Sequence, residues 1–228
     1  MPNQTALIVG ASRGLGLGLA REYLTRGWHV VGTVRGSART GLHELADRTD
    51  GKLTVETVDI TEPAQITELR RRLARRSFDL LFVNAGVAND PAETIGTVSD
   101  ATFLHVMVTN ALSPMRVVET LAPLVADNGT IAAMSSGLGS VADNEDGGWE
   151  VYRASKAALN TLMRSFAARH QRRRMLLVAP GWVRTDMGGP GAGLDVETSV
   201  RGIADTIASN VNRPGLGYVD YQGRTVRW

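Results

Sequence analysis

Apolar residues recur along the chain in two alternating patterns, short β-rich runs and longer stretches with helical spacing. The runs predict strands at 5–9, 29–34, 53–58, 80–83, 130–134 and 175–179. The helical spacing predicts helices at 15–24, 42–46, 66–73, about 101–125, about 151–170 and near Thr198. Residues 224–228 alternate polar and apolar side chains like a further, edge strand. This alternation predicts an α/β fold, a doubly wound parallel sheet of about seven strands with helices on both faces.

The length and composition favour one domain over residues 1–228. No Pro/Gly/Ser-rich linker and no internal repeat divides the chain, and a sheet of this type needs no division at this size. There is no cysteine, which excludes disulfides and thiolate chemistry. The histidines have no ligand spacing, so we assign no metal; they are His29, His43, His105 and His170.

The charge pattern argues against large charged partners. A net charge of +2 is too small to predict binding to nucleic acid or to a membrane. No apolar stretch approaches about 18 residues, and the N-terminus lacks a basic segment followed by a long apolar one. We therefore expect a soluble cytoplasmic protein with a small-molecule ligand.

A glycine-rich turn follows the first predicted strand and opens the first helix. In a doubly wound sheet of the Rossmann type, ligands bind at the carboxyl ends of the strands. Gly10, Gly14 and Gly16 would let the backbone approach a pyrophosphate at the helix N-terminus. Such a turn alone can equally be a structural strand-to-helix connection, but its place after the first strand favours a dinucleotide site.

The end of the second predicted strand bears on the choice of dinucleotide. NAD sites carry an acidic residue there, which would repel a 2′-phosphate. This chain instead has Arg35 at that point, and Arg13 lies within the glycine turn. Two arginines can clamp a phosphate by forked, charge-assisted bonds. Unless they are simply exposed surface residues, they favour NADP(H) over NAD(H).

Tyr152 and Lys156 lie four residues apart on a predicted helix. That spacing puts both side chains on one face, where an ammonium would stabilise a phenolate and lower its pKa. The pair alone is a weak signal, because ordinary helix surfaces often contain it. Ser136, which follows an apolar run upstream, strengthens the interpretation as a hydride-transfer site.

Six short motifs occur in the order and on the elements of one known family. They are the glycine turn, Asp59, Asn84-Ala85-Gly86, Asn110, Ser136 with Tyr152 and Lys156, and the segment from Pro180 to Thr185. With them the chain resembles a short-chain dehydrogenase/reductase over nearly its whole length. The expected cofactor-binding residues are Gly10, Ser12, Arg13, Gly14, Leu15, Gly16, Arg35, Asp59, Ile60, Asn84, Ala85, Gly86, Tyr152, Lys156, Pro180, Gly181, Val183 and Thr185.

The resemblance implies a catalytic tetrad of Asn110, Ser136, Tyr152 and Lys156. Ser136 and Tyr152 would bind the substrate carbonyl, and Tyr152 would give its proton to the developing alkoxide. Lys156 would lower the pKa of the phenol and hold the nicotinamide ribose, and Asn110 would anchor a water of the proton chain. Val183 and Thr185 resemble the residues that grip the carboxamide.

Two departures from the common family pattern concern the substrate side. The gap of 16 residues between Ser136 and Tyr152 is longer than usual, which leaves Ser135 as a fallback for the serine role. The segment after Thr185 is short, so we expect a small lid. With these features the chain resembles the subgroup of the bacterial C-factor proteins and the carbonyl reductases similar to them.

Three aromatic or sulfur-containing side chains should border the substrate. Trp149, Trp182 and Met187 favour an apolar or aromatic carbonyl compound, whereas the acidic residues at 143–150 are interpreted as a surface turn. The primary hypothesis is an NADPH-dependent carbonyl reductase. The alternatives are an alcohol dehydrogenase working in the oxidative direction and an NADP(H)-binding signalling protein of the C-factor type. Family members commonly pair through the helices expected here at 101–125 and 151–170, so a homodimer or homotetramer is expected.

Overall fold

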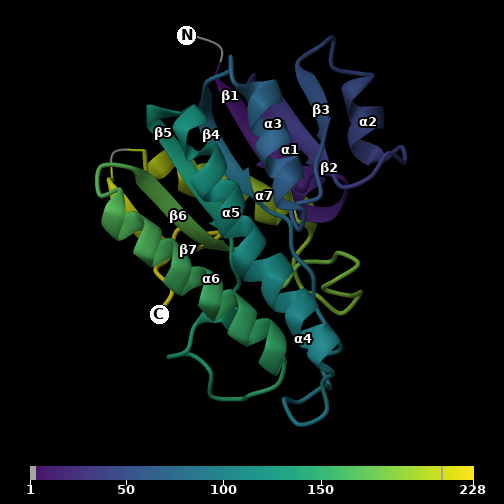
Figure 1. Ribbon diagram of the computed structural model, residues 1–228, viewed down its shortest axis with the longest axis vertical. Coiled ribbons are helices and arrows are strands. Elements are labelled where there is room, and N and C mark those ends of the chain that lie inside the picture. Colours follow the sequence, from purple (N-terminus) through teal and green to yellow (C-terminus); the bar gives the residue numbers. More distant parts are fainter. Residues whose placement is uncertain (1–3, 212) are drawn as a thin grey trace.

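The computed structural model describes residues 4–211 and 213–228, and its centre is a seven-stranded parallel sheet (Figure 1). The strand order is β3-β2-β1-β4-β5-β6-β7, so the order reverses between β1 and β4. The bounds are β1 (Thr5–Val9), β2 (His29–Val34), β3 (Leu53–Thr57), β4 (Phe78–Val83), β5 (Val125–Met134), β6 (Arg174–Ala179) and β7 (Gly215–Asp220). In sheets of this kind, ligands bind where the order reverses.

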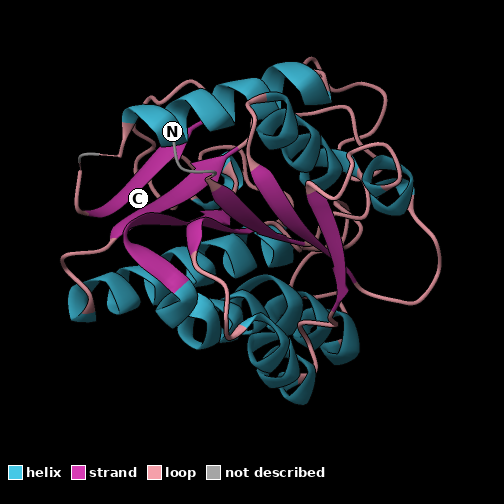
Figure 2. Ribbon diagram, turned by 90° about the horizontal axis from the view of Figure 1, so that it is seen from above, coloured by secondary structure: helices cyan, strands magenta, loops and turns pink. Residues whose placement is uncertain are grey.

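Side chains that alternate along the strands form two cores, one on each face of the sheet. In β1, Leu7 and Val9 face one core, whereas Ala6 and Ile8 face the other. Figure 2 shows the strands between two layers of helices, which confirms the predicted doubly wound sheet. One layer holds α3 (Pro63–Leu73), α5 (Ser113–Leu121) and α6 (Glu150–Arg169); the other holds α1 (Gly14–Thr25), α2 (Gly41–Ala46) and α7 (Val196–Ser209).

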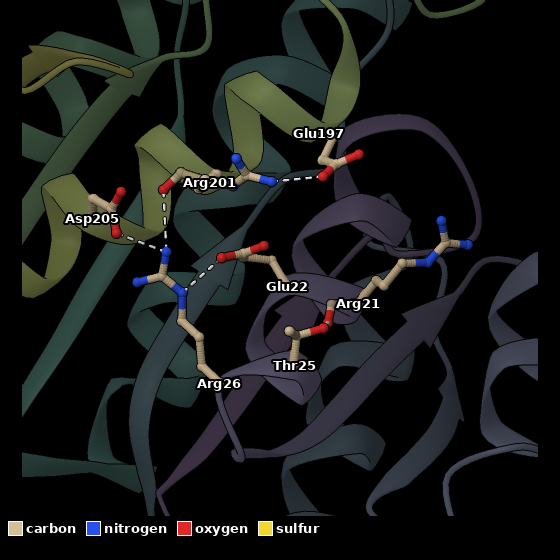
Figure 3. Close-up of polar contacts among 7 residues, drawn as sticks. All are labelled: Arg21, Glu22, Thr25, Arg26, Glu197, Arg201 and Asp205. Carbon is tan, nitrogen blue, oxygen red and sulfur yellow. Dashed lines mark hydrogen bonds and ion pairs between the residues drawn. The ribbon is translucent and has the colours of Figure 1, made fainter.

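Arg26, at the end of α1, joins α1 to α7 (Figure 3). Its Nε donates to Glu22 of the same helix at 2.8 Å. Its Nη2 donates to the Asp205 carboxylate at 2.7 Å and to the Arg201 carbonyl at 3.4 Å, both in α7. One guanidinium therefore bridges α1 and α7, which pack against each other.

The helix predicted at about 101–125 is present, but a π-helical turn interrupts its α-helical hydrogen bonding. The chain forms α4 (Asp100–Met107), a π-helical turn (Val108–Leu112) and α5, a short 3₁₀ turn follows, and β5 begins at Val125. Pro114 has no N–H to donate to the carbonyl four residues earlier, that of Asn110. The amide of Ser113 bonds instead to the carbonyl of Val108, five residues back. The helix is therefore interrupted at Asn110.

The edge strand predicted at 224–228 is wrong, because β7 occupies the sheet edge. The Asp220 carboxylate accepts hydrogen bonds from the amides of Gln222 and Arg224, both at 2.9 Å, and this turns the chain back. The amide of Val226 then donates to the Tyr218 carbonyl at 2.9 Å. Residues 224–228 therefore lie along β7 without forming a strand of their own.

None of the helices in the described part of the chain combines the length and the apolar character that a membrane crossing requires.

Candidate functional site

A cavity of about 1690 Å³ lies at the carboxyl ends of the strands. Residues that follow every one of the seven strands contribute to its wall. Pockets for one small molecule usually measure roughly 300–1,000 Å³. This cavity is large enough for a dinucleotide together with a second, smaller molecule.

The glycine turn forms the wall of the cavity after β1. Gly10 has a φ of +88°, and a Cβ there would lie 2.8 Å from the backbone of Ala85. A Cβ on Gly16 would lie 2.0 Å from the Gly10 carbonyl oxygen, which also accepts a hydrogen bond from Asn84 Nδ2 at 2.7 Å. Gly14, with a φ of +54°, shapes the turn itself. Because no side chain caps α1, its first amides are available to a phosphate.

The other expected cofactor residues line the same cavity, with one exception. Gly16 packs behind the turn instead of facing the cavity. Asp59 is held by its own loop, since its carboxylate accepts the Thr61 amide at 2.9 Å and the Thr61 hydroxyl at 2.7 Å. The remaining members of the set that face the cavity are Ser12, Leu15, Ile60, Asn84, Ala85, Gly86, Pro180, Gly181, Val183 and Thr185.

The two arginines expected to clamp a phosphate differ in their contacts. Arg35 lies exposed at the cavity wall and has no ion-pair partner among the described residues. Arg13 also lines the cavity, but its Nη1 pairs with the carboxylate of Asp186 at 2.6 Å. Both partners are about three-quarters exposed, so the pair contributes at most about 1 kcal/mol. A phosphate dianion can therefore displace Asp186 from Arg13.

Ser136, Tyr152 and Lys156 converge from the end of β5 and the first turns of α6. The Ser136 Oγ accepts a hydrogen bond from the Leu138 amide at 3.1 Å, which leaves its O–H as a donor. Lys156 Nζ donates to the Met134 carbonyl at 3.0 Å and lies 5.7 Å from the centroid of the Tyr152 ring. The three polar groups thus meet in one wall of the cavity.

Burial shifts the pKa values of Tyr152 and Lys156 in opposite directions. It raises the pKa of Tyr152 to about 12, and hydrogen bonding to Ser136 only partly opposes the rise. It lowers the pKa of Lys156 to about 8. The pKa of Tyr152 in this structure is therefore raised and not lowered, because desolvation by burial is its largest cause. The phenol is held neutral, which suits a proton donor.

The choice between the two adjacent serines follows from their hydrogen bonds. Ser135 is buried, and its hydroxyl donates to Asn160 Oδ1 at 2.7 Å. The Ser135 hydroxyl proton is therefore used in a hydrogen bond to α6, whereas the Ser136 hydroxyl proton is available to a ligand. This geometry favours Ser136 for contact with a ligand and gives no support to Ser135.

Asn110 is fully buried and does not line the cavity. Its Oδ1 accepts the Val87 amide at 2.8 Å, and its Nδ2 donates to the Val87 carbonyl at 2.8 Å and to Ser155 Oγ at 3.0 Å. The side chain therefore ties the π-helical turn to α6 and to the loop after β4. Any role in a proton chain falls to its main-chain carbonyl, which Pro114 deprives of the usual helical donor.

Two tryptophans and a methionine give the expected substrate region an apolar character. Trp149 has a φ of +53°, a left-handed conformation that costs a non-glycine residue about 1 kcal/mol, and its ring meets that of Tyr152 edge-on at 5.9 Å. Trp182 is 66% exposed and Met187 47% exposed, and both line the cavity. The indole N–H of Trp182 donates to the Gly188 carbonyl at 2.8 Å, which fastens the short lid.

Sequence reasoning missed the part of the cavity wall that comes from α4 and from the chain after β7. Tyr221, Arg224 and Val226 reach the cavity only because the chain turns back at Asp220. The sequence Asp220-Tyr-Gln-Gly223, with Asp at the first and Gly at the fourth position of a β-turn, is the signal that could have revealed this return. Other wall residues that sequence reasoning missed include Leu104, His105, Val108 and Leu138.

Within residues 4–211 and 213–228, no group of three or more His, Cys, Asp or Glu side chains is placed to hold a metal ion. We accordingly describe no metal centre.

Comparisons with known proteins agree with this geometry. The family model for short chain dehydrogenase matches residues 4–191. The C-signal protein of Myxococcus xanthus is 40% identical over 66% of this chain and 92% of its own length. A Burkholderia multivorans structure described as a short-chain dehydrogenase/reductase with bound NADP is 59% identical, covers all of both chains and superimposes with a TM-score of 0.98. A Pseudomonas aeruginosa carbonyl reductase in complex with NADP is 35% identical over 99% of this chain and 100% of its own, with a TM-score of 0.90.

The doubly wound sheet, the glycine turn and the Ser-Tyr-Lys trio define a dinucleotide-dependent oxidoreductase. The chain belongs to the short-chain dehydrogenase/reductase family.

Proposed function

We propose that this protein is an NADPH-dependent carbonyl reductase that converts a ketone or an aldehyde into an alcohol. The observation that carries the proposal is that Ser136, Tyr152 and Lys156 line the same cavity as the glycine turn and Arg35. The names of the similar carbonyl reductases support the same direction of reaction.

The preference for NADP(H) rests on the charge at the end of β2. Residues 33–38 contain Arg35 and no carboxylate. Arg35 would bind the 2′-phosphate, joined by Arg13 once it exchanges Asp186 for that phosphate. The NADP bound in two similar structures supports this assignment.

In the proposed reaction, NADPH supplies the hydride, and the side chains bind and protonate the carbonyl oxygen. The hydroxyls of Ser136 and Tyr152 donate hydrogen bonds to that oxygen, where negative charge develops. Tyr152 then transfers its proton to the alkoxide. Lys156, with a pKa of about 8, can return a proton toward the phenol near neutral pH and hold the ribose hydroxyls.

The wall around these donors favours an apolar or aromatic substrate. Trp149, Trp182 and Met187 offer ring faces and a thioether, and Leu138 and Val226 add aliphatic surface. Val183 and Thr185 would hold the carboxamide of the nicotinamide ring. A preference for small, highly polar sugars would contradict this substrate class.

The test begins with separate fluorescence titrations of NADPH and NADH. A panel of aldehydes, ketones and quinones is then added, and the loss of nicotinamide absorbance is followed. We expect tighter binding of NADPH and its oxidation by at least one apolar panel member. Tighter binding of NADH would overturn the assignment of Arg35.

Tyr152→Phe separates the reductase from the signalling alternative, which the similarity to C-signal keeps open. We expect the variant to bind NADPH normally and to lose turnover by at least about a hundredfold, as for removal of a general acid. Tight NADPH binding by the unaltered protein, with no oxidation across the panel, would favour the signalling function. Oxidation of alcohols alone would favour the dehydrogenase alternative.

We also propose that the protein acts as a homodimer or homotetramer through the outer surface of α5 and α6. Leu112, at the end of the π-helical turn, and Leu162, in α6, are each 41% exposed, which supports an apolar contact there.

A further inference from the structure

The backbone at Ser136 is held by side chains that come from β7 and α6. The Tyr218 hydroxyl donates to the carbonyl oxygen of Ser136, which also accepts the Gly139 amide at 3.0 Å. On the other side, Asn160 accepts from the Ser135 hydroxyl at 2.7 Å and donates to the Gly139 carbonyl at 3.1 Å. The segment from Ser135 to Gly139 is therefore anchored at both ends and in its middle.

Tyr218 is in turn held by the last residue of the described chain. The rings of Tyr218 and Trp228 lie 5.4 Å apart, and the guanidinium of Arg164 in α6 lies 4.7 Å from the Trp228 ring. The Trp228 carbonyl accepts the amide of Ala142 at 3.0 Å. The end of the segment that returns along β7, residues 224–228, thus contacts both α6 and the loop after Ser136.

The Tyr218 hydroxyl is suited to a permanent structural bond. Its side chain is 2% exposed, and burial raises its pKa, so the hydroxyl stays protonated and remains a donor. Tyr218 does not line the cavity. It therefore acts on a ligand there indirectly, through the Ser136 backbone that it holds and through a smaller electrostatic effect on Tyr152.

We propose that Tyr218, supported by Trp228, is a positioning residue that aims the Ser136 hydroxyl at the substrate carbonyl. Ser136 has an extended backbone, with φ −160° and ψ 152°, at the junction of β5 and the 3₁₀ turn Gly137–Gly139. Rotation of the peptide that follows would displace the Leu138 amide, whose hydrogen bond at 3.1 Å orients the Ser136 hydroxyl. Misplacement of a catalytic group by about 1 Å can cost about a hundredfold in rate.

The effect on rate rests on the proposed reductase function, whereas the ordering of residues 135–139 does not. Tyr218→Phe removes only the hydroxyl. We expect kcat for the carbonyl substrate to fall about tenfold or more, with the Kd for NADPH changed less than twofold. We also expect faster amide hydrogen exchange in a peptide covering residues 135–140.

Tyr23→Phe is the matched control. Tyr23 is also 2% exposed, but it lies in the other core, and its hydroxyl has no hydrogen-bond partner among the described residues. The same chemical change there should leave kcat and the exchange of residues 135–140 unaltered. If both variants lose activity equally, the loss reflects general destabilisation, and the proposal fails.

A double-mutant cycle with Ser136→Ala tests whether Tyr218 acts through Ser136. Once the Ser136 hydroxyl is absent, Tyr218→Phe should reduce kcat no further. An additive loss would overturn the proposal. If the unaltered protein reduces no compound of the panel, the reductase function fails, and unchanged exchange in Tyr218→Phe would separately refute the positioning role.

Trp228 supplies a second pair of variants in case Tyr218→Phe folds poorly. Trp228→Ala should lower kcat and speed exchange at residues 135–140, whereas Trp228→Phe, which keeps a ring against Tyr218, should restore most of both. Equal behaviour of the two variants would contradict the supporting role of Trp228.

Discussion

At the scale of single residues, one physical cause gives Tyr152 and Lys156 complementary acid–base properties. Burial disfavours the charged form of each group, so the pKa of the phenol rises to about 12 and that of the amine falls to about 8. The phenol is then a reliable proton donor throughout the neutral range. The amine lies near the pH at which it can exchange a proton, which suits a group that reprotonates the phenol.

The low pKa of Lys156 implies a cost to stability. Its pKa rises from about 8 in the folded protein to about 10.5 when the chain unfolds. Between these pH values the unfolded chain binds more protons, so the contribution of this residue to stability increases as the pH rises through the window. Below pH 8 the folded state bears the full cost of a buried charge.

Lys156→Met should therefore stabilise the protein at pH 7 while abolishing reduction. Allowing for the lost hydrogen bond to Met134, we expect the free energy of unfolding to rise by about 2 kcal/mol. Urea unfolding at pH 7 and pH 10 measures the change, which should be smaller at pH 10. Lys52→Met, at an exposed position, is the control and should change little at either pH. A less stable Lys156→Met variant at pH 7 would contradict this account.

At the scale of elements, the cofactor end of the cavity combines a fixed part with an adjustable one. The glycine turn is fixed, because Gly10 and Gly16 pack without space for a Cβ. The end of β2 carries the exposed Arg35, and the weak Arg13–Asp186 pair links the turn to the lid. Selectivity between the two dinucleotides should therefore depend on Arg35 more than on the turn.

Arg35→Asp should reverse the cofactor preference. Loss of a charge-assisted bond and gain of a repulsive carboxylate should weaken NADPH binding about 10- to 100-fold, with NADH unaffected or bound more tightly. Fluorescence titration with both dinucleotides measures the ratio. Arg39→Ala removes a neighbouring arginine that pairs with Asp47, and it should leave the ratio unchanged. Equal weakening of both cofactors by Arg35→Asp would show that Arg35 does not bind the 2′-phosphate.

At the scale of the whole molecule, the two helical layers have different tasks. The layer of α1, α2 and α7 supports the glycine turn, and Arg26 bridges two of its helices. The layer of α3, α5 and α6 carries Tyr152, Lys156 and the exposed Leu162. Figure 1 shows α5 and α6 next to each other in this layer. Association through that layer would support the helix that carries the reacting phenol.

Leu162→Arg tests the proposed association. A charge in an apolar contact is strongly unfavourable, so the variant should sediment with half the mass of the unaltered chain, as a monomer if that chain is a dimer and as a dimer if it is a tetramer. Val141→Arg, at an exposed apolar residue outside these helices, should keep the larger mass. An unaltered chain that is already monomeric would contradict the proposal.

The sequence predicted the sheet, its two helical layers and most of the cavity residues, because these depend on local periodicity and on short motifs at strand ends. It did not predict the interruption at Asn110, since apolar spacing continues through a single π-helical turn and Pro114 is tolerated in the first turn of α5. Nor did it predict the high pKa of Tyr152, because spacing on a helix gives no measure of burial. The bond between Tyr218 and Ser136 joins residues 82 positions apart, and no local pattern contains it.

The hold of β7 on Ser136 has a consequence for biosynthesis. Among the described strands and helices β7 comes last, so it leaves the ribosome after the others. A nascent chain can complete the glycine turn and bring Tyr152 beside Lys156 while the peptide at Ser136 still lacks its anchor. We therefore expect such a chain to contain its glycine turn and its Tyr152–Lys156 pair before it has the anchor that the proposed reduction requires.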